Sequence, residues 1–173
     1  MVNIWVISDT HFNHANMLNF TDSQGNKFRG DRFKSTQEMD EKIIQNWNEL
    51  VKPKDKVYHL GDVYFGGQSI ADKILGRLMG QKRLILGNHD KGKDTVLSKY
   101  FEKIYMWRLF KEFDMLLTHV PVHEDCFRKV NWNVHGHTHE KGSPKGPYHS
   151  VCVELTDYKP VHIEDLQKIL KRK

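Results

Sequence analysis

Short apolar runs alternate with helical patterns along most of the chain. Runs of aliphatic and β-branched residues, of the kind buried in a sheet that is covered on both faces, occupy residues 2–7, 56–60, 83–86 and 115–118. Apolar and polar residues alternate around Val134 and again around Val153, which predicts half-buried strands of a later antiparallel region. Residues 104–109 and 112–117 are expected to form a hairpin-like pair.

Three helices are predicted between and after these strands. Ser35 and Glu38 form a capping box, and apolar residues then recur at helical spacing. Ser69 is expected to open a second helix, with Gly80 as its C-terminal cap. A last helix is predicted over residues 163–170, where apolar residues recur every three or four positions.

The order of these elements predicts an α/β fold with two packed mixed β-sheets flanked by helices. The length of 173 residues suits one domain, so we expect residues 1–173 to form a single domain. Aromatic residues make up 11% of the chain, which supplies a core although hydrophobic residues reach only 38%.

Composition narrows the class of protein. No apolar run approaches the roughly 18 residues of a membrane span, and the first residues lack the features of a signal peptide. Cys126 and Cys152 form no CxxC motif, so two reduced thiols and a cytoplasmic location are expected. The net charge of +5 permits nucleic acid as a partner but does not favour it, because no long basic stripe with interleaved aromatic residues is present. The eleven histidines remain to be explained.

Metal-competent residues follow five of the predicted strands. These groups are Asp9-Thr10-His11, Gly61-Asp62, Gly87-Asn88-His89-Asp90, His119 and Gly136-His137-Thr138-His139. Open α/β sheets build their binding crevices just past the carboxyl ends of their strands. The repeated glycine fits sharp turns with backbone close to a ligand. Each group alone is a weak signal, but five together predict one site.

The ligand inventory points to paired metal ions. It comprises two carboxylates, one carboxamide, four imidazoles and no thiolate, which suits Mn²⁺, Fe²⁺, Zn²⁺ or Ni²⁺. Seven ligands exceed the needs of one ion with an open position, whereas two ions sharing one bridging carboxylate fit the count. Paired metals clamp the attacking and leaving oxygens of an in-line displacement. The residues therefore predict a binuclear metallohydrolase that acts on a phosphoester.

The order of these motifs resembles the signature of calcineurin-like metallophosphoesterases, from residue 4 to about residue 139. The resemblance implies that one ion binds to Asp9, His11, His139 and the bridging Asp62, and that the other binds to Asp62, Asn88, His119 and His137. It also implies two divalent ions, with Mn²⁺ preferred over Ni²⁺, Zn²⁺ or Fe²⁺, and attack on phosphorus by a metal-bridging hydroxide. His89 would protonate the leaving oxygen or neutralise its charge.

Departures from the family pattern narrow the expected activity. Phe65 stands where protein Ser/Thr phosphatases have a second Asp and purple acid phosphatases have a metal-binding Tyr, so neither activity is expected. The chain is similar to the compact bacterial and phage members, which implies a phosphodiesterase acting on a small or nucleotide-like substrate. The alternatives are a phosphomonoesterase, a nuclease and a catalytically silent protein-binding scaffold. Substrate, metal and oligomeric state stay open.

Further residues carry weaker predictions. His14 either reaches the phosphate or opens the following helix, and Arg128 either contacts a nucleotide or lies on a solvated loop with His123. His59 is expected to pack in the core, and His135 to lie in the core or behind the metal ligands. Residues 21–34 form either a flap over the metals or a plain excursion, and the sequence does not separate these.

Overall fold

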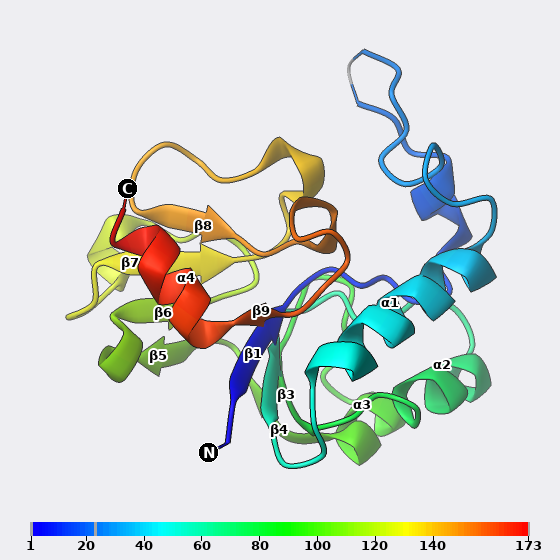
Figure 1. The fold of residues 1–173 in the computed structure, drawn as a ribbon, viewed down its shortest axis with the longest axis horizontal. Helices are drawn as coiled ribbons and strands as arrows, with labels where there is room; N and C mark the ends of the chain where they lie inside the picture. Colours follow the sequence, from blue (N-terminus) through cyan, green and yellow to red (C-terminus); the bar gives the residue numbers. More distant parts are fainter. Residues whose placement is uncertain (1, 23, 173) are drawn as a thin grey trace.

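The computed structural model describes residues 2–22 and 24–172, which form two β-sheets with helices outside them (Figure 1). The five-stranded sheet has the order β4-β3-β2-β1-β9, with β4 at Phe101–Tyr105, β3 at Gln81–Ile85, β2 at Lys56–His59, β1 at Ile4–Ile7 and β9 at Val161–His162. The four-stranded sheet has the order β5-β6-β7-β8, with β5 at Arg108–Phe110, β6 at Met115–Leu117, β7 at Trp132–His135 and β8 at Tyr148–Ser150. This architecture confirms the predicted fold class.

Alternating side chains of β1 separate two hydrophobic cores. Ile7 points to one core with helices α1 (Thr36–Leu50), α2 (Gln68–Leu75) and α3 (Thr95–Tyr100). Val6 points to the other core, which contains residues from both sheets and from helix α4 (Ile163–Leu170). Successive side chains of a strand face opposite sides of its sheet, so the five-stranded sheet is covered on both faces. No helix of the described chain is long and apolar enough to cross a membrane.

The prediction of an antiparallel later region is wrong for most of that region. Strands β6, β7 and β8 pair in parallel, and in the four-stranded sheet only β5 and β6 are antiparallel. The reason lies in the connections at 118–131 and 136–147, which are long enough for crossovers, whereas antiparallel neighbours are usually joined by tight turns. The predicted hairpin is confirmed for β5 and β6, while β4 belongs to the other sheet.

The expected strand around Val153 is also wrong. Strand β8 ends at Ser150, and Val153–Leu155 forms a 3-10 helix. Val151 packs in the core between the sheets and Val153 in the core beneath the helices, because the chain crosses from one to the other here. The apolar residues therefore alternate here because the chain passes from one hydrophobic core to the other.

All three predicted helices are present in the structure. Ser35 accepts a hydrogen bond from the Glu38 backbone at the start of α1, as the capping box predicts. Helix α2 instead begins after Gly67 and ends at Gly76, so the expected bounds at Ser69 and Gly80 are wrong. Gly80 occupies the left-handed region in the turn that leads into β3. Helix α3 has only six residues, too few for a periodic signal.

The carboxyl ends of β1, β2, β3, β6 and β7 bring the five polar groups together, as predicted. Hydrogen bonds join the segments directly: Asp9 N donates to the Gly61 carbonyl over 3.0 Å, and Gly136 N donates to the His119 carbonyl over 2.8 Å. His59 is buried behind them, with Nε2 2.9 Å from Thr10 Oγ1, which confirms its core position.

Candidate metal centre

Two groups of potential ligands lie beside each other at these strand ends. Asp9, His11 and His139 form the buried group; Asp62, His119 and His137 form the open group. Within each group the donor atoms lie within 4.8 Å of one another. Asn88 joins the open group, because its Oδ1 lies 2.9 Å from both His119 Nε2 and His137 Nδ1. The structure thus brings all seven predicted ligands together.

Asp62 lies between the two groups. Its Oδ2 is 3.7 Å from His11 Nε2 and 3.5 Å from His119 Nε2. Its Oδ1 accepts a hydrogen bond from the backbone N–H of His89 over 2.9 Å, which fixes the orientation of the carboxylate. One carboxylate oxygen therefore faces potential ligand atoms of both groups.

The buried group leaves polar atoms without hydrogen-bond partners. Asp9 Oδ2 accepts from Ser8 Oγ and from the His137 backbone, but Asp9 Oδ1 has no partner among the described residues. Both ring nitrogens of His11 are likewise buried without a partner in the described chain. Buried polar groups are costly unless they are paired or coordinate a metal, so Asp9 Oδ1 and the unprotonated ring nitrogen of His11 fit a cation.

A buried ion pair orients His139. Its Nδ1 donates to Glu154 Oε1 over 3.0 Å, which leaves the Nε2 lone pair directed toward Asp9 Oδ1 at 3.8 Å. Arg29 is fully buried and its Nη2 lies 2.6 Å from the same Glu154 oxygen. Arg29 Nε also donates to Glu154 Oε1 over 2.8 Å, and Nη1 and Nη2 donate to the carbonyls of Thr10 and Asp9. A carboxylate behind a histidine ligand fixes its tautomer and ring orientation.

The tautomer of His119 is fixed in the same way. Its Nδ1 lies 2.7 Å from the Leu60 carbonyl, and because a carbonyl only accepts, Nδ1 carries the hydrogen. In the neutral imidazole the Nε2 lone pair then faces the oxygens of Asn88 and Asp62. A divalent cation with nitrogen and oxygen ligands satisfies acceptors gathered in this way.

Electrostatics at the centre favour positive charge. Burial lowers the pKa of His119, but the carboxylates of Asp62 and Asp9 outweigh burial and raise the pKa above its usual value. Burial also lowers the pKa of His139, but the Glu154 carboxylate outweighs burial, so the pKa of His139 is likewise raised above its usual value. Burial would raise the pKa of Asp9, but the surrounding imidazoles hold it well below its usual range. The raised pKa values of His119 and His139 favour a cation at their ring nitrogens, whether a proton or a metal ion.

The backbone at the centre is unusual. The left-handed region is occupied by five of the seven potential ligands: Asp9, His11, Asp62, His137 and His139. Such conformations are uncommon for residues other than glycine and concentrate at functional sites. A Cβ atom on Gly136 would lie 2.0 Å from Ser8 Oγ and 2.4 Å from Asp9 Oδ2, so only glycine allows this close approach. The chain is therefore folded tightly around the position where ions would bind.

His89 lies at the exposed edge of the centre, outside both groups. Its ring centroid is 5.9 Å from that of His11 and 4.9 Å from that of Phe65. Phe65 stacks on His14 with centroids 3.7 Å apart. Burial, together with His11 and His89, lowers the pKa of His14 to about 4. His14 thus lies beside the centre as a neutral ring at neutral pH, while its contact with substrate stays a prediction.

The remaining candidate residues lie outside the two groups of potential ligands. Arg128 lines a cleft that begins at Asn88 and His119. His123 is exposed on the neighbouring loop, and His135 is fully buried with its Nδ1 facing the Gly136 carbonyl. The buried Arg29 anchors segment 21–34, whose described residues on either side of residue 23 project from the body of the molecule (Figure 1). Whether this segment closes over the centre stays an open prediction.

Comparison with known proteins decides the family. The family model of the calcineurin-like phosphoesterases matches residues 2–116. The chain belongs to this family. An uncharacterized protein of Methanocaldococcus jannaschii is 32% identical over 99% of this chain and 93% of its own length. The gene 66 protein of Mycobacterium phage D29 is 32% identical over 82% of this chain and 80% of its own.

A solved structure has a fold similar to that of this chain. A protein of unknown function from Aquifex aeolicus superposes with a TM-score of 0.77 and is 28% identical. The alignment covers 98% of this chain and all of that chain. These relatives support a compact member of the family of the bacterial and phage type.

Sequence reasoning missed three supporting residues of this phosphoesterase centre. Glu154 falls in the segment wrongly expected to be a strand, and Arg29 lies in an excursion that gave no sign of burial. Asp90 belongs to a recognised motif but received no role. It accepts hydrogen bonds from the backbones of Asp62, Val63 and Gly87 and so joins two ligand loops. Only the position of Asp90, directly after His89, offered a signal.

Proposed function

We propose that this phosphoesterase hydrolyses small or nucleotide-like phosphodiesters and uses two divalent ions as cofactors, preferably Mn²⁺. The observation that carries the proposal is the Asp62 carboxylate, whose Oδ2 lies 3.7 and 3.5 Å from imidazole nitrogens of the two groups. Asp9, His11 and His139 would hold one ion, and Asn88, His119 and His137 the other, with Asp62 shared. When bound, such ions activate water and offset charge on phosphoryl oxygens.

The protein's own side chains would orient the substrate and move a proton. His89 is exposed beside Asp62 and lies on the open side of the centre, where it would protonate the leaving oxygen. Two recesses flank this position. One begins at Asn88 and His119, and the other is lined by His89, Lys91 and Lys93. A diester could place one ester group in each recess, which favours diesters over monoesters.

The test is hydrolysis of bis-p-nitrophenyl phosphate and p-nitrophenyl phosphate by metal-free protein after addition of Mn²⁺, Ni²⁺ or Zn²⁺. We expect activity to require the metal and to be higher on the diester. Asp62→Asn should lower kcat/KM by about 10³-fold or more, because several kcal/mol of transition-state stabilisation would be lost. Asp165→Asn is the matched control, since Asp165 is exposed on α4.

Two results would contradict the proposal. One is wild-type protein that hydrolyses neither ester with any of the three metals. The other is an Asp62→Asn variant that retains wild-type activity. Equal rates on both esters would overturn only the preference for diesters.

A further inference from the structure

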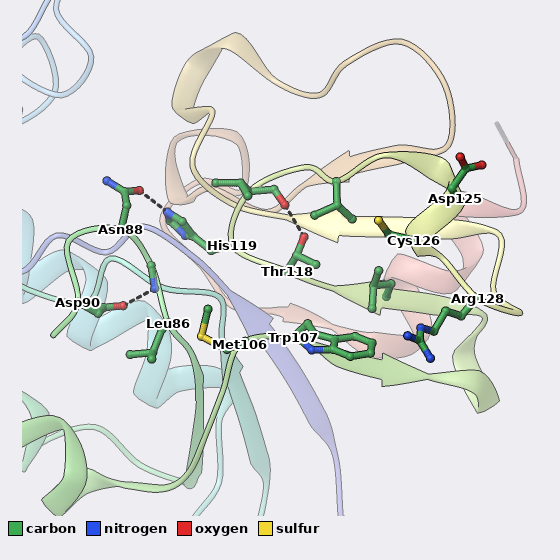
Figure 2. Close-up of a pocket in the computed structure, with 14 residues that line it drawn as sticks. Leu86, Asn88, Asp90, Met106, Trp107, Thr118, His119, Asp125, Cys126 and Arg128 are labelled. Carbon is green, nitrogen blue, oxygen red and sulfur yellow. Dashed lines mark hydrogen bonds between the residues drawn. The ribbon is translucent and has the colours of Figure 1, made fainter. Parts of the chain in front are cut away.

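A cleft of about 790 Å³ opens directly from the open group of ligands (Figure 2). Asn88 and His119 form its near end, and Asp125 and Arg128 form its far end. Its volume lies in the range of sites that bind small molecules. A molecule held at the open group can therefore extend into this cleft without leaving the protein surface.

The wall of the cleft is apolar and exposed. Met106 and Trp107, in the connection between β4 and β5, are 71% and 45% exposed, and Val120 is 40% exposed. Leu86, Leu116 and Val122 extend the apolar lining. Exposed apolar side chains gathered in one concave place mark a binding surface more often than scattered ones do. This surface adjoins the candidate metal centre, so a substrate bound at that centre can also contact this surface.

Trp107 is the principal flat surface within the cleft. The guanidinium carbon of Arg128 lies 5.5 Å from the centroid of the Trp107 ring, a cation–π contact. Figure 2 shows the two side chains next to each other, with Asp125 and Cys126 on the opposite side. A hydrocarbon chain would end against the charges of Asp125 and Arg128. A heteroaromatic ring can instead stack on the indole and hydrogen-bond at its edge.

We propose that this Trp107 cleft binds the flat heteroaromatic ring of a nucleoside whose phosphoester lies at the metal centre. Trp107 and Met106 would contact the face of the ring, and Arg128 and Asp125 would meet its polar edge. The proposal rests on the proposed function for the position of the phosphate, and it makes Trp107 a specificity-determining residue. It assigns Arg128 a role in substrate binding through this ring.

Binding measurements test the cleft separately from catalysis. Calorimetry with Mn²⁺-loaded protein compares adenosine 5′-monophosphate with methyl phosphate, which shares the phosphate but lacks the ring. We expect the nucleotide to bind about tenfold or more tightly than methyl phosphate, the usual contribution of a stacked base. Trp107→Ala should abolish this ratio, and Trp107→Phe should restore most of it because a ring is retained.

Two methionines offer a matched control. Met106→Ala shortens a side chain that lines the cleft. Met79→Ala makes the same change at a side chain that is 43% exposed and does not line the cleft. We expect Met106→Ala to lower the binding ratio several-fold and Met79→Ala to leave it unchanged. The same change of residue type at both positions separates a loss in the cleft from a general effect on the fold.

The proposal is overturned if wild-type protein binds both phosphates equally or binds neither, or if the ratio survives in Trp107→Ala. Hydrolysis of bis-p-nitrophenyl phosphate by the same preparation separates the two proposals. Hydrolysis without a binding ratio would refute the Trp107 cleft alone. A binding ratio without hydrolysis of any phosphoester would refute the proposed function and leave the cleft standing.

Discussion

The two groups of potential ligands differ in how the fold holds them. In the buried group Asp9 and His11 are shielded from solvent, and Arg29 and Glu154 fix His139 from behind. The open group has two exposed members, Asn88 and His137, and borders the Trp107 cleft. Ligands that are fixed before binding lose little freedom when a metal binds, which favours a tightly held ion in the buried group. An ion bound at the open group would exchange more readily and would face the substrate.

The largest effect expected from this difference concerns His89, on the open side. His89→Ala should lower kcat about 10²- to 10⁴-fold on diesters with a poor leaving group, because the proton donor is lost. Diesters with a good leaving group, such as p-nitrophenolate, should be hydrolysed at nearly the wild-type rate. The measurement is kcat for both substrates in both proteins. Equal loss on both would indicate that His89 stabilises charge in the transition state instead.

The next effect concerns the support of the buried group. Glu154→Gln should weaken Mn²⁺ binding there about 10- to 100-fold, because the carboxylate that orients His139 is lost. Burial would raise the pKa of Glu154, but Arg29 and His139 lower it to about 2, so the wild-type group is ionised at neutral pH. Titration calorimetry measures the affinity, with Glu164→Gln at the exposed start of α4 as control. An unchanged affinity would show that the buried group needs no such support.

The converse experiment acts on the open group. Asn88→Ala should weaken Mn²⁺ binding at the open group by about tenfold, while the buried group keeps its affinity. Calorimetry should then show a larger difference in affinity between the two classes of sites than in the wild type. Asn26→Ala, on the projecting loop, is the control. Equal weakening of both sites would contradict the division of the centre into a buried and an open group.

A smaller effect concerns the stability of the loop that follows His11. The backbone N–H of Asn13 is shared between both carboxylate oxygens of Asp40, and burial raises the pKa of Asp40 to about 7. The folded chain therefore holds this proton more tightly than the unfolded chain, where the pKa is near 3.8. Its contribution to stability is full below about pH 4 and is lost as the pH rises to about 7, on the order of 4 kcal/mol at most.

Asp40→Asn removes this titration. The variant should match the wild type near pH 4 and be more stable than it at pH 8, because an amide carries no buried charge. Urea unfolding at several pH values measures the difference, with Asp165→Asn as the exposed control. A variant less stable than the wild type at pH 8 would show that the ionised carboxylate stabilises the loop.

The sequence predicted the ligand set better than it predicted the support behind it. Motifs after strands place Asp9, Asp62 and His119 by chain order alone, since parallel strands end at one edge of a sheet. Glu154 and Arg29 lie 125 residues apart, and their contact arises only when the segment after β8 packs against the loop after β1. Such a contact has no local signal in spacing or periodicity.

The lack of a local signal also explains where the predicted fold differs from the structure. Alternation around Val153 predicts a strand because periodicity does not show which core receives each side chain. The direction of β7 and β8 depends on long connections that carry no turn signal. Nor could spacing predict that Trp107 would contact Arg128 in a cleft that Met106 also lines, since Trp107 and Arg128 lie on separate connections.

The most direct test of the account is the number and separation of bound ions. Crystals soaked in Mn²⁺ can be examined by anomalous scattering. We expect two peaks about 3.5–4 Å apart, one beside Asp9 and His11 and one beside His119 and His137, with Asp62 between them. A single peak, no peak, or two peaks without Asp62 between them would contradict this expectation.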